Sequence, residues 1–392
     1  MLIESIEIKG FKSLVLDEPI KLGRVNCFIG ANGVGKSNVL EALGVLGAAA
    51  SGSVNDESLL RRGVRASVPS LYKNSFKDER GPSSIGFTAH GVGKVVYGVS
   101  LQPDSTWSYK SEYWQDECQT IIAADERSHS NLNVKAGLAA LKTVNLAEDN
   151  QALQLLSDLQ HYAIYTPNTP MLRAITPDQQ TREPVGLNGG NLAEGFDLLQ
   201  KYLSSLGETG EDILDEVLQL IDWVNDVAIS TQAAKILSAS VPRTKNVIKF
   251  TDRFMTKSRN ELTAYDASEG ALYVLFTAIL SLLPQSPRIF AIDNLDQALN
   301  PRLVSRLVER LVTWLQVNHV NKQLLFTAHN PAVLDGLDLA NPDVRLFTVQ
   351  RNNRGFTRVA PIVLSDKLLA LNQQYPLSRL WLMGNLGALP NV

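Results

Sequence analysis

Apolar and polar residues follow two different periods along the chain. From Leu2 to Ile8 they alternate, as in a half-buried strand, and a second alternating stretch runs through Leu14, Leu16 and Ile20. Residues 25–29 form a short continuous apolar run, which is typical of a strand buried on both faces, and residues 38–49 follow with helical spacing. The pattern therefore predicts an antiparallel layer, followed by a strand, a loop and a helix.

The middle of the chain divides into a strand-rich part and a helix-rich part. Residues 84–89, 94–101 and 106–109 have strand character and are separated by turn residues, which predicts a β meander. From about residue 131 to residue 237 the apolar spacing is helical, in three blocks within 138–159, 192–203 and 213–224. We expect a helical lobe inserted into an α/β domain.

Helices and buried strands alternate in the last third of the chain. The expected strands are residues 235–240, 247–251, 288–292 and 323–327, and the expected helices are 269–283 and 301–317. Residues 344–350 and 357–363 predict a closing hairpin. This alternation predicts a mainly parallel sheet. We divide the chain into an N-terminal lobe (1–130), a helical insertion lobe (131–235) and a C-terminal lobe (236–392).

Composition indicates an ordered protein with a large core. Of the 392 residues, 44% are hydrophobic and 20% are charged, and the formal net charge is -3. This balance excludes a globally basic nucleic-acid coat, so any DNA contact must be local. Two cysteines, Cys27 and Cys118, cannot build a disulfide framework. No export signal opens the chain, and the longest apolar run, residues 271–283, is too short to span a bilayer, so we expect a cytoplasmic protein without membrane contact.

A phosphate-binding loop separates the buried strand from the helix that follows it. Residues 30–37 satisfy the pattern G-x-x-x-x-G-K-[ST]. Glycines let several backbone N–H groups point at phosphate oxygens, and the start of the helix adds a partial positive charge. We expect Lys36 to neutralise the β- and γ-phosphates of ATP and Ser37 to bind Mg²⁺. The expected nucleotide-binding residues are Gly30, Asn32, Gly33, Val34, Gly35, Lys36, Ser37 and Asn38.

Two further residues have the chemistry that such a loop needs. A carboxylate must complete the magnesium site, and Asp293 follows the apolar strand 289–292. The alternative for Asp293 is a helix cap after a core strand. Ser268 begins an apolar helix, where its side chain and free backbone N–H groups could meet an anion, although taken alone it is an ordinary N-cap.

The order of these motifs resembles the ABC-type ATPase heads of the RecF, SMC and OLD-like AAA branch. A P-loop, a long gap, Ser-x-Gly at a helix start, an apolar strand ending in Asp, and a strand ending in Ala328-His329 follow one another. By this likeness Ser268 and Gly270 belong to the signature motif, residues 298–301 to the D-loop, and His329 is the switch histidine. The resemblance implies an α/β P-loop NTPase fold of the ABC head type, with a mixed sheet and an antiparallel β subdomain.

The resemblance also implies that dimerisation is part of the site. In such heads the signature of one subunit faces the nucleotide on the P-loop of another, so a homodimer or higher homo-oligomer would hold ATP between its copies. Lys36 would bind the γ-phosphate from one side and Ser268 from the other. Loss of that phosphate would then remove the affinity for the closed state.

Asn294 departs from the pattern of these heads. They usually have Asp-Glu at the strand end, where the glutamate orients the attacking water, whereas Asn294 follows Asp293 here. Asparagine cannot accept a proton, and a positioned general base is typically worth about 10²- to 10⁴-fold in rate. We therefore expect slow hydrolysis, or Asp296 as a substitute base, against the alternative of a solvated turn carboxylate. His329 could polarise the water or sense the γ-phosphate, against a structural role at the strand end.

A basic stretch and an apolar C-terminal segment leave alternatives open. Six basic residues share seventeen positions with one acid, Asp252, and predict either a nucleic-acid contact or a solvated strand face. They are Arg243, Lys245, Lys249, Arg253, Lys257 and Arg259. Residues 377–383 predict docking on the home domain or on a partner protein.

Two functions fit the sequence. The first is a regulatory ATP-binding scaffold, which resembles ATPase subunits of prokaryotic antiviral defence systems (Septu PtuA-like or PARIS AriA-like) and would control an effector protein, expected to be a nuclease. The second is a RecF-like ATPase of DNA repair or chromosome maintenance that hydrolyses ATP to cycle. Asn294 favours the switch over the cycling enzyme.

Overall fold

The computed structural model describes residues 3–77, 79–117, 119–125, 132–141, 146–147, 149–231, 237, 246–316 and 321–387. The chain forms two compact units. Unit 1 comprises Met1–Ile164, Pro287–Leu295 and Asn321–Val392, and unit 2 comprises Tyr165–Ser286 and Asp296–Val320. The chain therefore passes from one unit to the other four times. The division into lobes 1–130, 131–235 and 236–392 stays a prediction.

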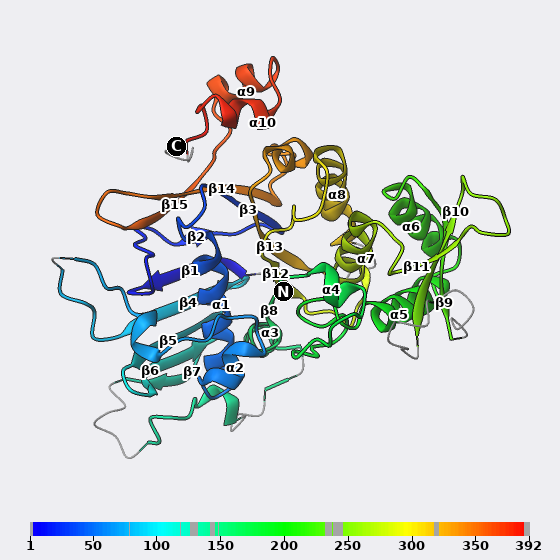
Figure 1. Ribbon diagram of the computed structural model, residues 1–392. Helices are drawn as coiled ribbons and strands as arrows, with labels where there is room; N and C mark the ends of the chain where they lie inside the picture. The colour runs from blue at the N-terminus through cyan, green and yellow to red at the C-terminus, as the bar shows by residue number, and fades with distance from the viewer. Residues whose placement is uncertain are drawn as a thin grey trace. The chain divides into compact units, whose positions relative to one another are not determined.

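A six-stranded mixed sheet of order β15-β14-β3-β13-β12-β8 runs through unit 1 (Figure 1). Its strands are β3 (Val25–Ile29), β8 (Ala163–Tyr165), β12 (Ile289–Ile292), β13 (Gln323–Ala328), β14 (Val344–Arg351) and β15 (Thr357–Pro361). β3 lies parallel to β13 and β14, β12 lies parallel to β13, and β15 is antiparallel to β14, which confirms the predicted hairpin. β3, β12 and β13 are buried at every position, which explains why their sequences are continuously apolar rather than alternating.

The second sheet of unit 1 is antiparallel, with the order β2-β1-β4-β5-β6-β7. It contains β1 (Ile3–Lys9), β2 (Ile20–Lys21), β4 (Ile85–Gly91), β5 (Val96–Pro103), β6 (Trp107–Gln115) and β7 (Thr120–Ala124). The predicted meander is confirmed. Of the second predicted strand, Ile20 lies in β2 and pairs with Ile6 of β1. The prediction is wrong at Leu14 and Leu16, where the Leu14 carbonyl accepts from the side chain of Asn74 and the next backbone N–H donates to the carbonyl of Thr357.

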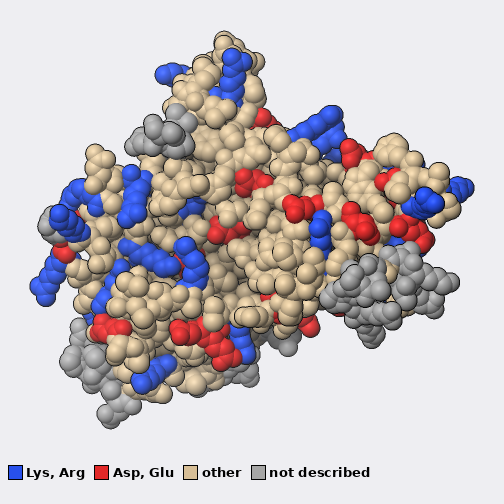
Figure 2. Space-filling model, in the orientation of Figure 1, with Lys and Arg blue, Asp and Glu red and all other residues tan. Residues whose placement is uncertain are grey.

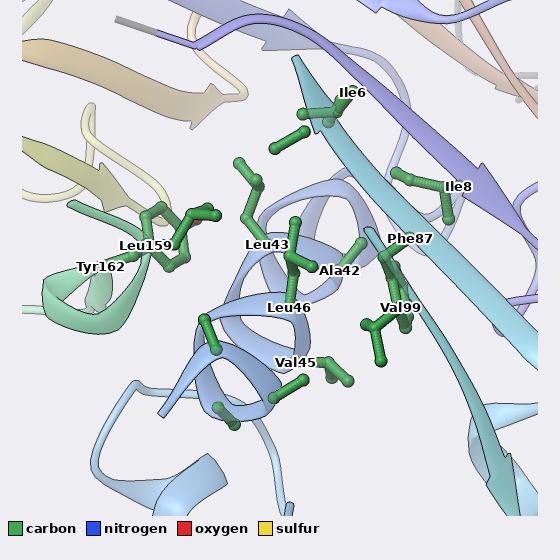
Figure 3. Packing of buried hydrophobic residues seen from close by; sticks show 14 of the residues in the cluster. Ile6, Ile8, Ala42, Leu43, Val45, Leu46, Phe87, Val99, Leu159 and Tyr162 are labelled. Atoms are coloured by element: carbon green, nitrogen blue, oxygen red, sulfur yellow. The ribbon is translucent and has the colours of Figure 1, made fainter. Parts of the chain in front are cut away.

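Helix α1 (Lys36–Ala50) packs between the two sheets, with contacts to β13 on one side and to β4 and β5 on the other. Figure 3 shows this core around Ala42, Leu43, Val45 and Leu46 of α1, with Ile6, Ile8, Phe87, Val99, Leu159 and Tyr162 around them. Unit 1 also contains α2 (Asp56–Leu60), α3 (Gln151–His161), α9 (Asp366–Asn372), α10 (Leu377–Leu382) and the 3-10 helices η1 (Pro69–Tyr72), η3 (Ala139–Leu141) and η6 (Pro331–Gly336). Because α1 is buried on all sides, its N-terminus is held in place by the core.

The apolar C-terminal segment docks on its own unit. In α10 the side chains of Leu377, Leu380 and Trp381 are buried. Ser378 binds the carboxylate of Asp335 in η6 through its backbone N–H (2.9 Å) and its hydroxyl (2.7 Å). The first of the two sequence-based interpretations of this segment is therefore confirmed.

The described part of unit 2 has five helices and a three-stranded antiparallel sheet of order β11-β10-β9. The elements are α4 (Thr169–Leu172), α5 (Leu192–Ser204), α6 (Glu208–Gln219), α7 (Glu269–Leu282), α8 (Pro301–Trp314), β9 (Val224–Ser230), β10 (Val247–Asp252) and β11 (Glu261–Thr263). Helix α7 contacts the other four helices and is buried from Ala271 to Leu282, which confirms the predicted buried helix. Among the described residues, no helix combines the length and apolarity needed to cross a bilayer.

Three sequence-based expectations for residues 131–240 differ from the structure or fall largely outside the described residues. Val224 was predicted in a helix, but α6 ends at Gln219 and Val224 begins β9, where it pairs with Asp252 of β10. The short strand β8 also lies inside the stretch that the spacing predicted as helical. The predicted strand 235–240 lies outside the described residues except for residue 237.

Candidate functional site

Residues 30–35 connect β3 to α1 as a curled loop. Gly30, Gly33 and Gly35 have φ angles of +155°, +75° and +104°, which L side chains rarely adopt. A Cβ on Gly30 would lie 2.2 Å from the carbonyl oxygen of Val349, and one on Gly35 would lie 2.7 Å from Oγ1 of Thr357. No atom lies within 4 Å of a Cβ built on Gly33. The loop therefore requires glycine, and the space beside Gly33 is open.

The side chain of Lys36 folds back over this loop. Lys36 is 5% exposed, and its Nζ donates to the carbonyl oxygens of Gly30 (2.8 Å) and Ala31 (2.9 Å). Nζ also lies 3.4 Å from Nδ1 of His329. Because an ammonium only donates, we assign Nδ1 as an acceptor and the proton of the neutral imidazole to Nε2. Nε2 then donates to Oδ1 of Asn294, 3.0 Å away.

Asp293 lies where β12 ends, next to the start of α1. Its two carboxylate oxygens lie 3.0 and 2.8 Å from the hydroxyl of Ser37, and Thr327 donates to Oδ1 at 2.5 Å. The backbone N–H of Asn294 donates to the same threonine hydroxyl at 2.8 Å. β3, β13 and β12 are neighbouring parallel strands, so their carboxyl ends meet at one edge of the sheet and bring Ser37, Asp293 and His329 together.

These residues fit the nucleotide and metal that the sequence implies. A serine hydroxyl beside carboxylate oxygens supplies the hard oxygen ligands that Mg²⁺ takes together with water. A buried ammonium, left-handed backbone and a helix N-terminus suit phosphate oxygens. Ser37 and Asp293 would therefore hold the metal, and Lys36 with its loop the triphosphate. Within the described ranges, no group of three or more His, Cys, Asp or Glu side chains could hold a metal ion elsewhere.

Contacts from distant segments fix the loop, and the sequence did not indicate them. Thr357, at the start of β15, donates to the carbonyl oxygen of Val34 at 2.5 Å and lies 2.8 Å from the hydroxyl of Ser13. Asn38 donates to the same Ser13 hydroxyl at 3.0 Å. Thr357 is fully buried. The sequence pointed to one of these residues only: Ser13 belongs to residues 6–14, the segment that resembles the opening strand of ABC-type heads.

A buried carboxylate lies one turn inside α1. Glu41 is 2% exposed and forms ion pairs with Lys12 and with Arg65, whose Nε lies 2.6 Å from Oε1. Burial alone would raise the pKa of the Glu41 carboxyl, but the hydrogen bond from Arg65 and the charges of Lys12 and Arg65 outweigh it and lower the pKa. Arg65 also donates to Oδ1 of Asn38 at 3.3 Å. This charged cluster therefore supports the start of the P-loop helix.

In unit 2, Ser268 is the N-cap of α7. Its side chain is exposed, and its hydroxyl accepts from the backbone N–H of Ala271 at 3.4 Å and faces the indole N–H of Trp223 at 3.3 Å. A Cβ on Gly270 would lie 3.2 Å from Cδ2 of Leu303, so glycine permits the close approach of α8. Ser268 and Gly270 line a cavity of about 550 Å³ together with residues 219–223 and the first turns of α8. The contact from Trp223 had no signal in the sequence.

The structure brings together Lys36, Ser37, Asp293, Asn294 and His329 within unit 1. The predicted signature residues and Asp296 belong to unit 2. The backbone carbonyl of Asp296 accepts from Leu299 at 3.3 Å, and the role of its carboxylate as a base stays a prediction. Of the basic stretch, Arg243 and Lys245 lie outside the described residues.

Comparison with known families and proteins identifies the type of site. The family model described as "AAA domain, putative AbiEii toxin, Type IV TA system" matches residues 25–335. The chain belongs to this AAA family. An 82-residue stretch is 37% identical to the DNA replication and repair protein RecF of two Porphyromonas gingivalis strains. The match covers 21% of this chain and 22% of the RecF chains, so the likeness spans about a fifth of their length.

SMC head domains are among the solved structures with the same fold. The SmcHead bound to the C-winged helix domain of ScpA has a TM-score of 0.55 and 16% identity, with 92% of this chain and 98% of that chain covered. The Smc head domain with an extended coiled coil from Pyrococcus furiosus has a TM-score of 0.50 and 14% identity, with 95% and 99% covered. The expected α/β fold of the ABC head type is confirmed. The chain is therefore a P-loop domain of this AAA family, and its fold is similar to that of SMC heads.

Proposed function

We propose that this AAA domain binds ATP and Mg²⁺ between two copies of the chain, hydrolyses ATP slowly, and controls an effector protein through its bound and free states. Lys36 and the P-loop bind the triphosphate, Ser37 and Asp293 bind the metal, and Ser268 of the second copy contacts the γ-phosphate. Mg²⁺, when bound, neutralises phosphate charge. The proposal places the chain in the cytoplasm.

The pairing of Asn294 with His329 carries the proposal of a slow switch. At the position where related heads have glutamate, the amide oxygen of Asn294 accepts from His329 at 3.0 Å and cannot take a proton from water. The other ring nitrogen of His329 faces Lys36. A site without a positioned base loses about 10²- to 10⁴-fold in rate. The ATP-bound state should therefore be long-lived, as a binding switch requires.

The exposure of Ser268 supports a contact with a second copy. A residue that binds the nucleotide of another chain must be accessible, and Ser268 is exposed at the start of α7 beside an open cavity. The helix start contributes partial positive charge that favours a phosphate anion. The indole of Trp223 is a positioning group for the serine hydroxyl.

The partner protein is inferred from two likenesses. Solved SMC heads of this fold are bound to parts of ScpA, so a separate protein docks on such a head. The sequence resembles ATPase subunits of antiviral systems that work with an effector. We infer that this chain controls a nuclease effector in antiviral defence.

Light scattering with and without nucleotide tests the proposal. Wild type should double its mass with ATP and Mg²⁺ but not with ADP, and Lys36→Ala should stay monomeric. Lys110→Ala, which removes an exposed cation on β6, is the matched control and should behave as wild type. The product of the neighbouring reading frame is then added to both states. A wild-type mass that ignores ATP would refute the ATP-bound dimer, and an effector that binds equally in both states would refute the control of that effector.

The RecF match favours a second candidate function, an ATPase of DNA repair or chromosome maintenance. The support for this candidate is the 82-residue stretch in which this chain is 37% identical to RecF. Such an enzyme would release phosphate several-fold faster when duplex DNA is present, whereas the switch would not respond. Phosphate release with and without duplex DNA therefore separates the two functions.

A further inference from the structure

The turn between β10 and β11, residues 253–260, carries an aromatic side chain that the fold does not bury. Phe254 is 78% exposed, the highest value among the exposed large apolar side chains in the described part of the chain, and its neighbour Met255 is 43% exposed. A phenylalanine placed in water forgoes the burial that normally stabilises it. A single exposed apolar residue is common on protein surfaces, so the residues that share the turn with Phe254 decide whether it marks a binding site.

The same turn carries three cations, Arg253, Lys257 and Arg259. Lys257 and Arg259 are exposed, and neither side chain forms an ion pair with another described residue. Arg253 donates to the backbone carbonyl of Val224 and ties the base of the turn to β9. The turn therefore offers two unneutralised positive charges on an anchored loop.

The two acids that flank the turn in sequence, Asp252 and Glu261, have partners of their own. Asp252 accepts with Oδ1 from the backbone N–H groups of Phe254 (2.7 Å) and Met255 (2.9 Å), which fixes the backbone at the aromatic residue. Glu261, at the far end of the turn, pairs with Lys249 of β10 at 2.8 Å. Neither carboxylate forms an ion pair with Lys257 or Arg259, so an anion that approaches this turn meets an exposed aromatic side chain and two cations without an ion pair among the described residues.

The net charge of the whole molecule is negative, so any contact with a polyanion must depend on a local group of cations. On the face drawn in Figure 2, many Lys and Arg side chains gather at the left of the view, whereas acidic and basic side chains are mixed at the right; the net charge is -3. Figure 1 shows the turn between β10 and β11 projecting beyond its sheet. A projecting turn with its own cations can contact a polyanion locally, although the net charge of the whole molecule is negative.

We propose that this turn binds single-stranded nucleic acid, with Phe254 stacked on an unpaired base and Lys257 and Arg259 on the flanking phosphates. Every base has a π-face, and an exposed aromatic ring with flanking cations is the combination that single-strand binding surfaces use. In a duplex these faces are hidden between base pairs. An anionic membrane would require a wider apolar surface than one phenylalanine and one methionine. This contact lies within unit 2, and Phe254, Lys257 and Arg259 are not among the residues proposed to bind the nucleotide.

Fluorescence anisotropy of the full chain without nucleotide tests this proposal. The probes are a labelled oligo(dT) of about 20 nucleotides, a duplex of equal length, and vesicles with and without anionic lipid. Wild type should bind the single strand more tightly than the duplex. Phe254→Ala should weaken that binding about 5- to 100-fold, which is the loss of one base stack. The double variant Lys257→Ala/Arg259→Ala should also weaken binding. The slope of log K against the logarithm of the salt concentration should become shallower by about 1.4, which is about 0.7 for each of two phosphates.

Matched controls come from other exposed positions. Leu71→Ala removes an apolar side chain that is 62% exposed, and Lys110→Ala/Lys135→Ala removes two exposed cations, and both variants should bind as wild type. The proposal is overturned by absent single-strand binding at about 50 mM salt, by duplex binding that is equally tight, by a Phe254→Ala variant with unchanged affinity, or by vesicle binding that needs Phe254. Thermal melts of all variants check that the fold is intact.

Discussion

Nε2 of His329 lies 3.0 Å from Oδ1 of Asn294, where β13 and β12 end side by side. Lys36 lies on the other side of the ring, 3.4 Å from Nδ1, and therefore fixes the tautomer in which Nε2 donates. The amide oxygen of Asn294 is thus turned toward the histidine. This geometry connects Lys36, the proposed phosphate ligand, to Asn294, where the resemblance to ABC-type heads leads us to expect a glutamate.

Replacing Asn294 with glutamate should raise ATP turnover. The carboxylate supplies the missing proton acceptor, so phosphate release should increase by roughly 10²-fold or more, and the ATP-bound dimer should become shorter-lived. Phosphate release under excess ATP measures the rate. Asn294→Gln is the matched control because it adds length without a base, and it should stay as slow as wild type. A glutamate variant no faster than the glutamine variant would show that Asn294 does not limit the rate.

Asp296 is tested as the substitute base. Asp296→Asn keeps the size of the side chain and removes the proton acceptor, so residual turnover should fall, by up to about 10²-fold, while ATP binding is unchanged. Single-turnover phosphate release separates the chemical step from binding. Equal single-turnover rates for the variant and wild type would remove Asp296 from the mechanism.

Thr357 should act as a positioning residue for the P-loop. Thr357→Val removes the hydroxyl that donates to the carbonyl of Val34 and that meets Ser13, and it leaves the buried volume nearly constant. Unsatisfied buried groups cost about 1–3 kcal/mol, so we expect the Kd for ATP to rise by at most about 5- to 150-fold. Titration calorimetry measures Kd, and Thr357→Ser should restore it because the hydroxyl returns. A folded Thr357→Val protein with the wild-type Kd would contradict this role.

Glu41 should stabilise the fold only while it is ionised. Removing one partner of a buried ion pair costs about 3–5 kcal/mol, so Glu41→Gln should lower the free energy of unfolding by that order at pH 7. The pKa of Glu41 is lowered in the folded state, so its contribution is complete above the ordinary pKa of about 4.3 and is lost as the pH falls through the folded-state pKa. The difference between wild type and Glu41→Gln should therefore shrink below about pH 4.

Urea unfolding at pH 7 and below about pH 4 measures the difference in the free energy of unfolding between wild type and Glu41→Gln. Glu57→Gln is the control, because the Glu57 carboxylate pairs with Arg61 on the surface, with side chains 71% and 68% exposed. Such surface pairs contribute at most about 1 kcal/mol. If Glu41→Gln costs the same at acid and neutral pH, the charge of Glu41 is not what stabilises the fold.

Local sequence patterns were sufficient to predict the P-loop and the carboxylate that follows a buried strand. The glycines of the P-loop, Lys36 and the carboxylate after a buried strand are separated by fixed spacings or end a recognisable element, so sequence alone located them. The pairing of Asn294 with His329 depends on which strands are neighbours, and spacing does not encode strand order. The same holds for Thr357 beside Ser13. Val224 was placed in a helix because its apolar spacing continues past the end of α6.

Mixing two inactive variants tests most directly whether two copies share one ATP. Lys36→Ala removes the P-loop cation, and Ser268→Arg blocks the exposed helix start at a cost of about 1 kcal/mol for the lost cap. Each variant alone should show neither ATP-dependent dimers nor phosphate release. An equimolar mixture should recover both, because each mixed dimer contains one site with an intact P-loop and an intact serine. A mixture as inactive as its separate components, while wild type assembles on ATP, would contradict the shared site.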